Sequence, residues 1–278
     1  MRIVCVGDLG VDRYMPGDKQ LPGGITANFA RQARRCFEDS DEIQIISVVG
    51  TDEDEAATAL SSVNIPGIEC HIAHLEGKTP VQYIEVNDNG ERNFTAYEPG
   101  VLDRFEIDKH QAAVMEKADL IMTPVYWQIH NVFDAVFSIQ TNAVIAVDFS
   151  DFSTDPDFEL LERYANRINI AFFGLTADQT ELIEGLMEIA VRKNILCVIT
   201  LAENGCMAIA DAMIISEKAV PVTNVVDTTG AGDAFAAGFL STLMHEGNVK
   251  DALQYGAKIA ARTVQHLGSV PPKKPLVI

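Results

Sequence analysis

The sequence is short of positive charge. It has 21 lysines and arginines against 40 aspartates and glutamates, which gives a formal net charge of −19. Proteins that bind nucleic acids need a basic face for the phosphate backbone, so this balance argues against a nucleic-acid partner. It does not argue against ATP, because Mg²⁺, loop N–H groups and a helix terminus can meet its charge locally. We therefore expect small-molecule ligands.

Long apolar runs are also missing. No apolar run reaches the length of about 18 residues that a membrane helix needs, so we expect no membrane partner. The apolar start of the chain meets Asp8 at once, which indicates a buried strand and not a signal peptide. The five cysteines are scattered and form no Cys-x-x-Cys, which is typical of free thiols in a reducing compartment. The sequence thus predicts a cytoplasmic protein.

Two common cofactor motifs are absent as well. No Gly-x-Gly-x-x-Gly follows the first expected strand, which argues against a dinucleotide site. One His-x-x-His, formed by His71 and His74, has no third ligand of matching spacing nearby, so we assign no zinc site to it.

The most informative stretch is 227–233, which reads Asp-Thr-Thr-Gly-Ala-Gly-Asp. It lies between a β-branched run, 220–226, and an apolar segment of small residues that we expect to be helical. Two glycines let such a loop turn sharply and bring backbone N–H groups to one point. The N-terminus of the following helix aims further N–H groups and a positive dipole end at that point. The stretch therefore predicts a site for an anion such as phosphate.

Asp233 lies at the edge of this anion site. Its carboxylate could take a proton from an attacking hydroxyl. It could equally cap the helix, as aspartate often does. The stretch alone leaves both interpretations open.

A second glycine motif, Gly23-Gly24 with Asn28 four residues later, opens an expected helix over 27–35. The glycines allow the backbone to approach a ligand, and the Asn28 amide offers a donor and an acceptor for a hydroxyl. Asp12 follows the first expected strand, 3–6. It could bond two sugar hydroxyls or act as a turn residue.

Buried strands alternate with helices along most of the chain, which predicts an α/β fold with a parallel sheet and helices on both faces. Such sheets bind ligands at the carboxyl ends of their strands. We expect Asp12, Asp148, Thr200 and the loop that starts at Asp227 to gather at this edge.

Three segments break the alternation of strands and helices: 70–75, 79–86 and 92–97. They show partial alternation of polar and apolar residues, and a turn at 87–91 joins the last two. They predict a small antiparallel sheet that could cover a ligand.

The two glycine motifs together resemble the signatures of the ribokinase-like (PfkB) family of sugar kinases. The C-terminal signature corresponds to 227–239, and the N-terminal signature to Gly23-Gly24-x-x-x-Asn28 with Asp12 upstream. The resemblance spans nearly the whole chain. It implies a three-layer α/β sandwich with a mainly parallel central sheet, as one domain over 1–278, and a small β-sheet lid from about 11–22 and 70–100.

The resemblance also implies an activity, that of an ATP-dependent phosphotransferase with an alcohol group as acceptor. Asp233 would be the catalytic base. The backbone of Gly230, Ala231 and Gly232 would form the anion hole for the transferred phosphoryl group. The residues that would hold the sugar are Asp12, Gly24, Asn28 and Asp233.

On the nucleotide side, 200–205 is similar to the Thr-x-Gly-x-x-Gly of the family, with Ala202 in place of the first glycine. A methyl group there tolerates fewer backbone angles. The resemblance implies ATP binding by Thr200, Gly205, Gly230 and Gly232.

The family motif Asn-x-x-Glu, which holds Mg²⁺ through water, is altered here, and the residue that replaces its Asn is not identified. A register shift of four places Asp178 and Glu181 on it. Glu181 would then contribute to a magnesium site, although an acid at a helix start is an equal alternative. Asp227, with Ser269, matches the region where many members bind a monovalent cation such as K⁺.

Within the family, the chain looks most like the fructoselysine kinase branch, for example over 87–92 and 97–101. This predicts transfer of the γ-phosphate to a hydroxymethyl group of a sugar or sugar-amine, fructoselysine among them. The alternatives are a ribokinase, a fructokinase, a nucleoside kinase that stacks its base on Tyr83, Tyr97 or Trp127, and a sugar-binding relative with impaired catalysis. A homodimer through the small sheet is a further expectation, because exposed strand edges invite pairing.

Overall fold

The structure is a computed structural model, and it describes residues 1–278 except 18, 88–91, 151, 155, 211 and 270–278. The described residues contain a nine-stranded sheet. Its strands in spatial order are β13 (Met213–Glu217), β12 (Cys206–Ala210), β11 (Leu196–Thr200), β10 (Ile170–Gly174), β9 (Val144–Asp148), β8 (Leu120–Pro124), β1 (Arg2–Val6), β4 (Glu42–Val49) and β5 (Ile68–His74). The strands from β11 to β5 are parallel, and β12 and β13 add an antiparallel edge. The predicted, mainly parallel central sheet is confirmed.

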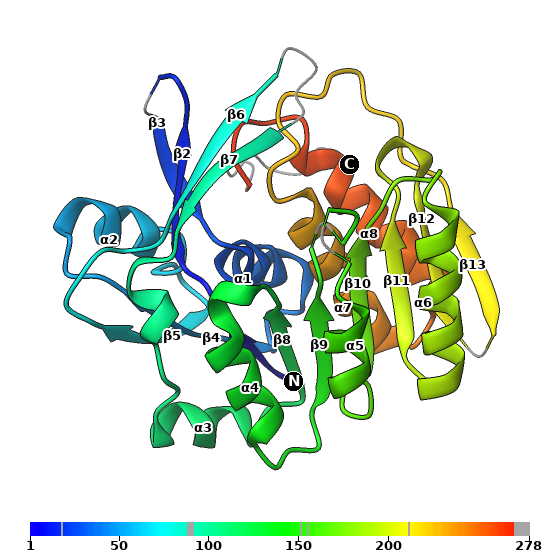
Figure 1. Cartoon of the computed structure of the whole chain (residues 1–278), viewed down its shortest axis with the longest axis horizontal. Helices are drawn as coiled ribbons and strands as arrows, with labels where there is room; N and C mark the ends of the chain where they lie inside the picture. The colour runs from blue at the N-terminus through cyan, green and yellow to red at the C-terminus, as the bar shows by residue number, and fades with distance from the viewer. Residues whose placement is uncertain (18, 88–91, 151, 155, 211, 270–278) are drawn as a thin grey trace.

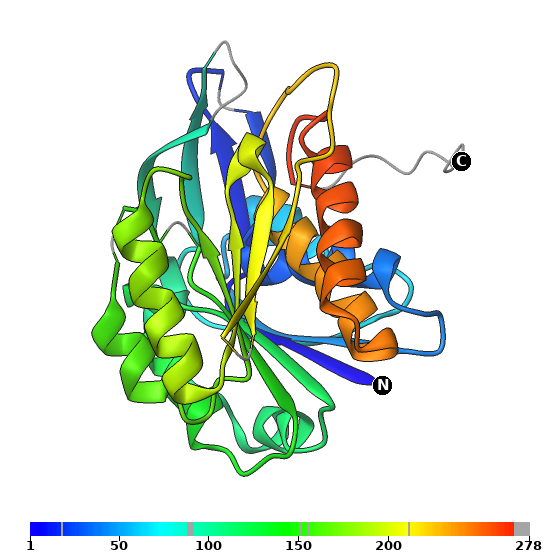
Figure 2. The same ribbon diagram turned by 90° about the vertical axis from the view of Figure 1, so that its right-hand side faces the viewer.

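Helices cover both faces of this sheet, as Figure 2 shows. One face packs against α1 (Ile25–Cys36), α2 (Glu53–Leu60), α7 (Ala231–Glu246) and α8 (Val249–Thr263). The other packs against α3 (Lys109–Met115), α4 (His130–Ser138), α5 (Phe158–Tyr164) and α6 (Thr180–Lys193). Strand β1 is buried on both faces of the sheet. Ile3 and Cys5 belong to one core cluster and Val4 and Val6 to the other, and all four side chains are fully buried. A parallel strand covered on both faces needs such an uninterrupted apolar run.

A second, four-stranded sheet stands at the upper left of Figure 1. Its strands in spatial order are β3 (Lys19–Gly23), β2 (Gly10–Tyr14), β6 (Val81–Val86) and β7 (Arg92–Glu98). The pairs β2–β3 and β6–β7 are antiparallel, and β2 runs parallel to β6. Only three residues separate β1 from β2, so the first strand of the large sheet leads almost directly into the small one.

The strand expected at 70–75 is not part of the small sheet. It is β5, which pairs in parallel with β4 at the edge of the large sheet. Its partial alternation of polar and apolar residues comes from partial exposure at that edge, since most of its side chains are only half-buried. The expected hairpin turn falls largely on 88–91, outside the described residues. The β-branched run at 220–226 forms no strand and lies in the connection from β13 to α7.

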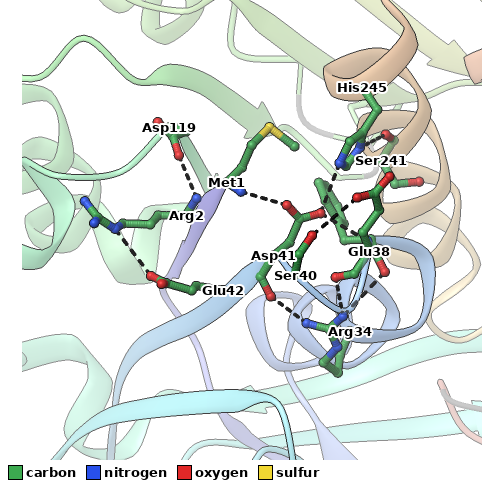
Figure 3. A network of polar contacts seen from close by, with 11 residues as sticks. Met1, Arg2, Arg34, Glu38, Ser40, Asp41, Glu42, Asp119, Ser241 and His245 are labelled. Carbon is green, nitrogen blue, oxygen red and sulfur yellow. Dashed lines mark hydrogen bonds and ion pairs between the residues drawn. The ribbon is translucent and has the colours of Figure 1, made fainter.

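A polar network ties the start of β1 to the ends of α1 and α7, as Figure 3 shows. The buried Asp41 carboxylate accepts a hydrogen bond from the Met1 α-amino group at 2.7 Å and lies 3.1 Å from His245 Nε2. Burial acts to raise the pKa of Asp41, but the α-amino hydrogen bond and nearby positive charge outweigh it and hold that pKa below its usual value. Arg34 donates to the carbonyls of Asp41 and Glu38 at 2.8 and 2.6 Å. The network fastens the molecule at the amino ends of the strands.

Among the helices that the structure describes, none is long and apolar enough to cross a membrane.

Candidate functional site

The glycine loop leads straight into α7, as the sequence predicts. Gly230 is the residue before the helix and has a φ of 74°, the left-handed region that favours glycine. A Cβ at this position would lie 2.4 Å from Ser269 Cβ, so no other residue fits. At Gly232, in the first turn, a Cβ would meet nothing within 4 Å. First-turn N–H groups have no acceptor within their own helix and so suit an anion, but the Ala231 N–H already donates to the Thr228 carbonyl at 3.2 Å.

Asp233 and Asn28, which the sequence assigns to two separate motifs, are in contact. Asn28 Nδ2 donates to Asp233 Oδ2 at 2.9 Å, and both residues are buried. Ser269 Oγ in turn donates to Asn28 Oδ1 at 2.5 Å. Since the hydroxyl occupies the amide oxygen, the amide presents its NH₂ group to the carboxylate. Asn28 therefore fixes the orientation of the Asp233 side chain, from the first turns of α1 and α7.

Asp8 organises the start of α1, a role that the sequence analysis did not assign. Its carboxylate accepts from the backbone N–H groups of Ile25 and Thr26, both at 2.9 Å. Burial raises the pKa of Asp8, and these two hydrogen bonds oppose that shift. Gly24 has a φ of 103° and a Cβ there would lie 3.0 Å from the Asp8 carbonyl oxygen. The sequence did contain a signal for this role: an acid two positions after β1, ahead of the Gly-Gly motif that opens α1.

Asp12 lies within β2 of the small sheet, which excludes the turn interpretation. Asp12 is buried, and a Cβ on Gly23 of the neighbouring strand β3 would lie 2.1 Å from Asp12 Oδ1, so the carboxylate needs that glycine. Tyr97, from β7, lies near this carboxylate: burial chiefly raises the pKa of its phenol, and the charges of Asp8 and Asp12 add to the shift. The Tyr97 and Tyr126 hydroxyls are 3.4 Å apart.

Asp148 and Thr200 both lie at the edge of the large sheet where its parallel strands end. Asp148 closes β9 and Thr200 closes β11, with β10 between them. The Asp148 carboxylate accepts from Ser150 N–H at 2.7 Å, and Thr200 Oγ1 donates to the Phe173 carbonyl at 3.4 Å. Both residues are thus at the carboxyl ends of parallel strands, where the sequence predicts ligand binding.

The turn after Thr200 keeps left-handed geometry at both positions where the resemblance implies glycine. Gly205 has a φ of 97°, and a Cβ there would lie 2.2 Å from the Glu217 carbonyl oxygen. Ala202 has a φ of 49°, which costs an alanine on the order of 1 kcal/mol. The backbone shape is retained although the first glycine is replaced.

Glu181 lies in the first turn of α6 and is exposed. Within the described part of the chain, no group of three or more His, Cys, Asp or Glu side chains is placed to hold a metal ion. Mg²⁺ at nucleotide sites commonly uses one or two carboxylates and completes its shell with phosphate and water. A single carboxylate such as Glu181 fits that donor set.

Asp227 is fully buried and its carboxylate already has three donors. Oδ1 accepts from Thr229 N–H at 2.8 Å, and Oδ2 accepts from Gly268 N–H at 2.8 Å and from the Tyr14 hydroxyl at 2.7 Å. A cation on Oδ2 would have to approach where two hydrogens already point. These residues therefore do not fit the monovalent cation expected at Asp227. Tyr14 was not singled out from the sequence, since nothing in its local pattern indicates a partner 213 residues away.

Comparison with known proteins finds one matching family model and several similar proteins. The family model described as "pfkB family carbohydrate kinase" matches residues 164–275. A fructosamine kinase from Bacillus subtilis strain 168 is 27% identical over 270 residues, which cover 95% of this chain and 90% of that protein. A fructoselysine 6-kinase from Escherichia coli strain K12 is 27% identical over 268 residues, covering 96% and 98%.

Solved structures share the fold. The crystal structure of adenosine kinase from Sinorhizobium meliloti superposes with a TM-score of 0.83 at 18% identity and covers 97% of this chain and 95% of its own. A ribokinase from Thermotoga maritima gives a TM-score of 0.79 at 18% identity, covering 98% and 96%. At this identity the likeness speaks for the fold alone, and it confirms the expected ribokinase-like α/β architecture with its small second sheet.

Proposed function

This chain carries a domain of the pfkB family of carbohydrate kinases, and from that premise we propose that it transfers the γ-phosphate of ATP to a hydroxymethyl group of a sugar or sugar-amine. The observation that carries the proposal is the contact between Asn28 and Asp233 beside the glycine loop. It joins a group suited to a sugar hydroxyl, a carboxylate suited to a base, and N–H donors suited to phosphate.

In the proposed reaction, Asp233 accepts the proton of the acceptor hydroxyl while the hydroxyl oxygen attacks the γ-phosphorus. A new O–P bond forms, and the bond between the γ-phosphorus and the bridging oxygen breaks to release ADP. The N–H groups at 230–232 stabilise the charge on the phosphoryl group in transit. Mg²⁺, when bound, neutralises the ATP phosphates, and Glu181 would hold it through water. Thr200 and Gly205 would bind the remainder of the nucleotide.

The sugar would lie between the small sheet and the first turn of α1. Asp12 and Asn28 would bond its hydroxyls, and Gly24 would allow close approach of the backbone. The buried state of both side chains supports this, because a dry pocket strengthens each hydrogen bond to the ligand. Tyr97 and Tyr126 would form a wall of the same pocket.

Fructoselysine is the first substrate to test, because two relatives that align over nearly all of this chain are named for fructosamine and fructoselysine. An ADP-release assay should compare fructoselysine, a second fructosamine, ribose, fructose and adenosine. We expect the highest kcat/KM for a fructosamine. Preference for ribose or fructose, or for adenosine, would favour the corresponding alternative kinase.

The catalytic part of the proposal is tested with Asp233→Asn. Loss of general-base help should lower kcat by on the order of 10²-fold or more. Asp251→Asn is the matched control, since Asp251 also lies in the first turn of a helix but at the exposed start of α8. Full kcat in Asp233→Asn would remove the role. Ligand-induced thermal stabilisation without any ADP release would indicate a sugar-binding protein that lacks catalysis.

A further inference from the structure

A buried contact joins the small sheet to the glycine loop. Tyr14, the last residue of β2, donates its hydroxyl to Asp227 Oδ2 at 2.7 Å. Tyr14 is 7% exposed and Asp227 is 0% exposed, so water does not compete for this hydrogen bond. Asp12 lies two residues earlier on the same strand, and residues two apart in a strand point to the same face. The face of β2 that carries Asp12 thus also carries the group that holds Asp227.

Asp227 connects the two backbone segments that shape the anion site. Its Oδ1 accepts from Thr229, just before Gly230, and its Oδ2 accepts from Gly268, just before Ser269. Gly230 and Ser269 are packed so closely that no Cβ fits between them. The position of the Asp227 carboxylate therefore sets the shape of the loop that would receive the phosphoryl group.

We propose that the Tyr14 hydroxyl takes the place on Asp227 that a monovalent cation would occupy, so that Tyr14 is a positioning residue and the enzyme needs no such cation. This inference rests on the proposed function for its effect on turnover, but not for its effect on stability. Tyr14 compensates the buried negative charge from one side while two N–H groups do so from the others. The hydroxyl also makes the loop sensitive to the position of the small sheet.

The chemistry of the Tyr14 hydroxyl supports this role. Burial chiefly, together with the Asp227 charge, raises the pKa of Tyr14, so the hydroxyl keeps its proton and acts as a donor at neutral pH. A cation at Oδ2 would displace that donor and leave a phenol oxygen buried without its partner. Removing only the hydroxyl would reverse the preference, because the carboxylate would lose one donor and gain a space beside it.

The test measures melting temperature and kinase activity in KCl and in choline chloride at equal ionic strength. For the wild type we expect the same melting temperature and a kcat within about twofold in both salts, as expected where no specific ion binds the folded state. For Tyr14→Phe we expect kcat in choline chloride to fall by about tenfold, the size typical of a buried group left unpaired. KCl should restore most of that loss and raise the melting temperature of this variant.

Tyr164→Phe is the matched control, because its hydroxyl donates to the Asp134 carboxylate in an exposed pair remote from the site. It should behave as the wild type in both salts. The proposal would be overturned if KCl raised the melting temperature of the wild type by several degrees and its kcat several-fold. This measurement stands even if Tyr14→Phe does not fold. Unaltered kcat and melting temperature of Tyr14→Phe in choline chloride would overturn it too. Absence of ADP release from every substrate would overturn the proposed function but not the thermal result.

Discussion

Ala202 holds a left-handed backbone conformation that its side chain disfavours, with a φ of 49°. Replacement by glycine should relieve that cost, and the looser unfolded chain should offset part of the gain, so we expect Ala202→Gly to raise stability by about 0.5–1 kcal/mol. Urea unfolding measures this. Ala73→Gly in β5 is the control and should destabilise, because glycine weakens a strand whose pairing is regular. Destabilisation by Ala202→Gly would mean that the alanine methyl makes a contact of its own.

Ser269 orients the Asn28 amide, and this has a kinetic consequence. Without its hydroxyl, the amide can rotate and present its oxygen to Asp233. We expect Ser269→Ala to lower kcat by about tenfold, the effect of one lost buried hydrogen bond, with the KM for ATP unchanged. Ser241→Ala in α7 is the matched control, since its buried hydroxyl donates only to the Gly238 carbonyl within the same helix. Equal kinetics in both variants would contradict the role of Ser269.

Individual site residues differ in how far the sequence reveals them. Asn28 and Asp233 could be proposed as site residues because each follows a glycine loop at the start of a helix, a local pattern that the sequence shows directly. Tyr14 and Asp8 could not, because their value lies in partners that only the fold supplies. The Tyr14 hydroxyl meets a carboxylate 213 residues away, and the Asp8 carboxylate meets the helix start of another segment. The potassium expectation at Asp227 likewise could not take the Tyr14 hydroxyl into account and stays a prediction.

At the scale of elements, a substitution in the first turn of α7 should affect stability and activity in opposite directions. A Cβ at Gly232 meets open space, so Gly232→Ala should keep or raise stability slightly, by up to about 1 kcal/mol, because alanine is the better helix former. The same methyl would stand over the anion site and should lower kcat/KM for ATP by at least about tenfold. Thermal unfolding together with initial-rate kinetics checks both halves.

Gly230→Ala is the counterpart, because its Cβ would overlap Ser269 in a left-handed turn. It should lose stability by on the order of 1–3 kcal/mol as well as activity. If Gly232→Ala also unfolded easily, the open space above α7 would be wrong. If Gly232→Ala retained full activity, the anion would bind elsewhere.

Most helices and parallel strands could be predicted from their apolar runs and helix starts, because burial on both faces leaves a strong pattern. The strands at the edges of the sheet were predicted less accurately. β5 was expected in the small antiparallel sheet, since partial exposure at a sheet edge produces the same alternation of polar and apolar residues. β12 and β13 were not anticipated, and their antiparallel pairing continues a sheet that the βαβ alternation predicts to be parallel.

At the scale of the whole molecule, Asp41 fastens the end of the sheet opposite the site. We expect Asp41→Asn to lower stability at pH 7 by about 1–3 kcal/mol, since it weakens the contacts to the Met1 amino group and His245. The pKa of Asp41 lies below its usual value in the folded state. Its contribution is therefore full above the unfolded pKa of about 4 and is lost as the pH falls through the folded pKa.

Urea unfolding of the wild type and Asp41→Asn at pH 7 and pH 3 tests this dependence. The difference between the two proteins should shrink at the lower pH. Asp39→Asn is the control, because Asp39 is fully exposed and should change stability little at either pH. A difference that stays constant or grows toward pH 3 would contradict the sign.

The chain closes its site across nearly its entire span: Asn28 meets Asp233 over 205 residues and Ser269 over 241. A polypeptide still emerging from the ribosome therefore has its first glycine motif long before it has the second. Until Ser269 has been synthesised and has left the exit tunnel, the nascent chain lacks a site residue that the Asn28 amide needs. The contacts of Asn28 with Asp233 and Ser269 therefore form only after both helices and the segment that carries Ser269 have been synthesised and have left the tunnel.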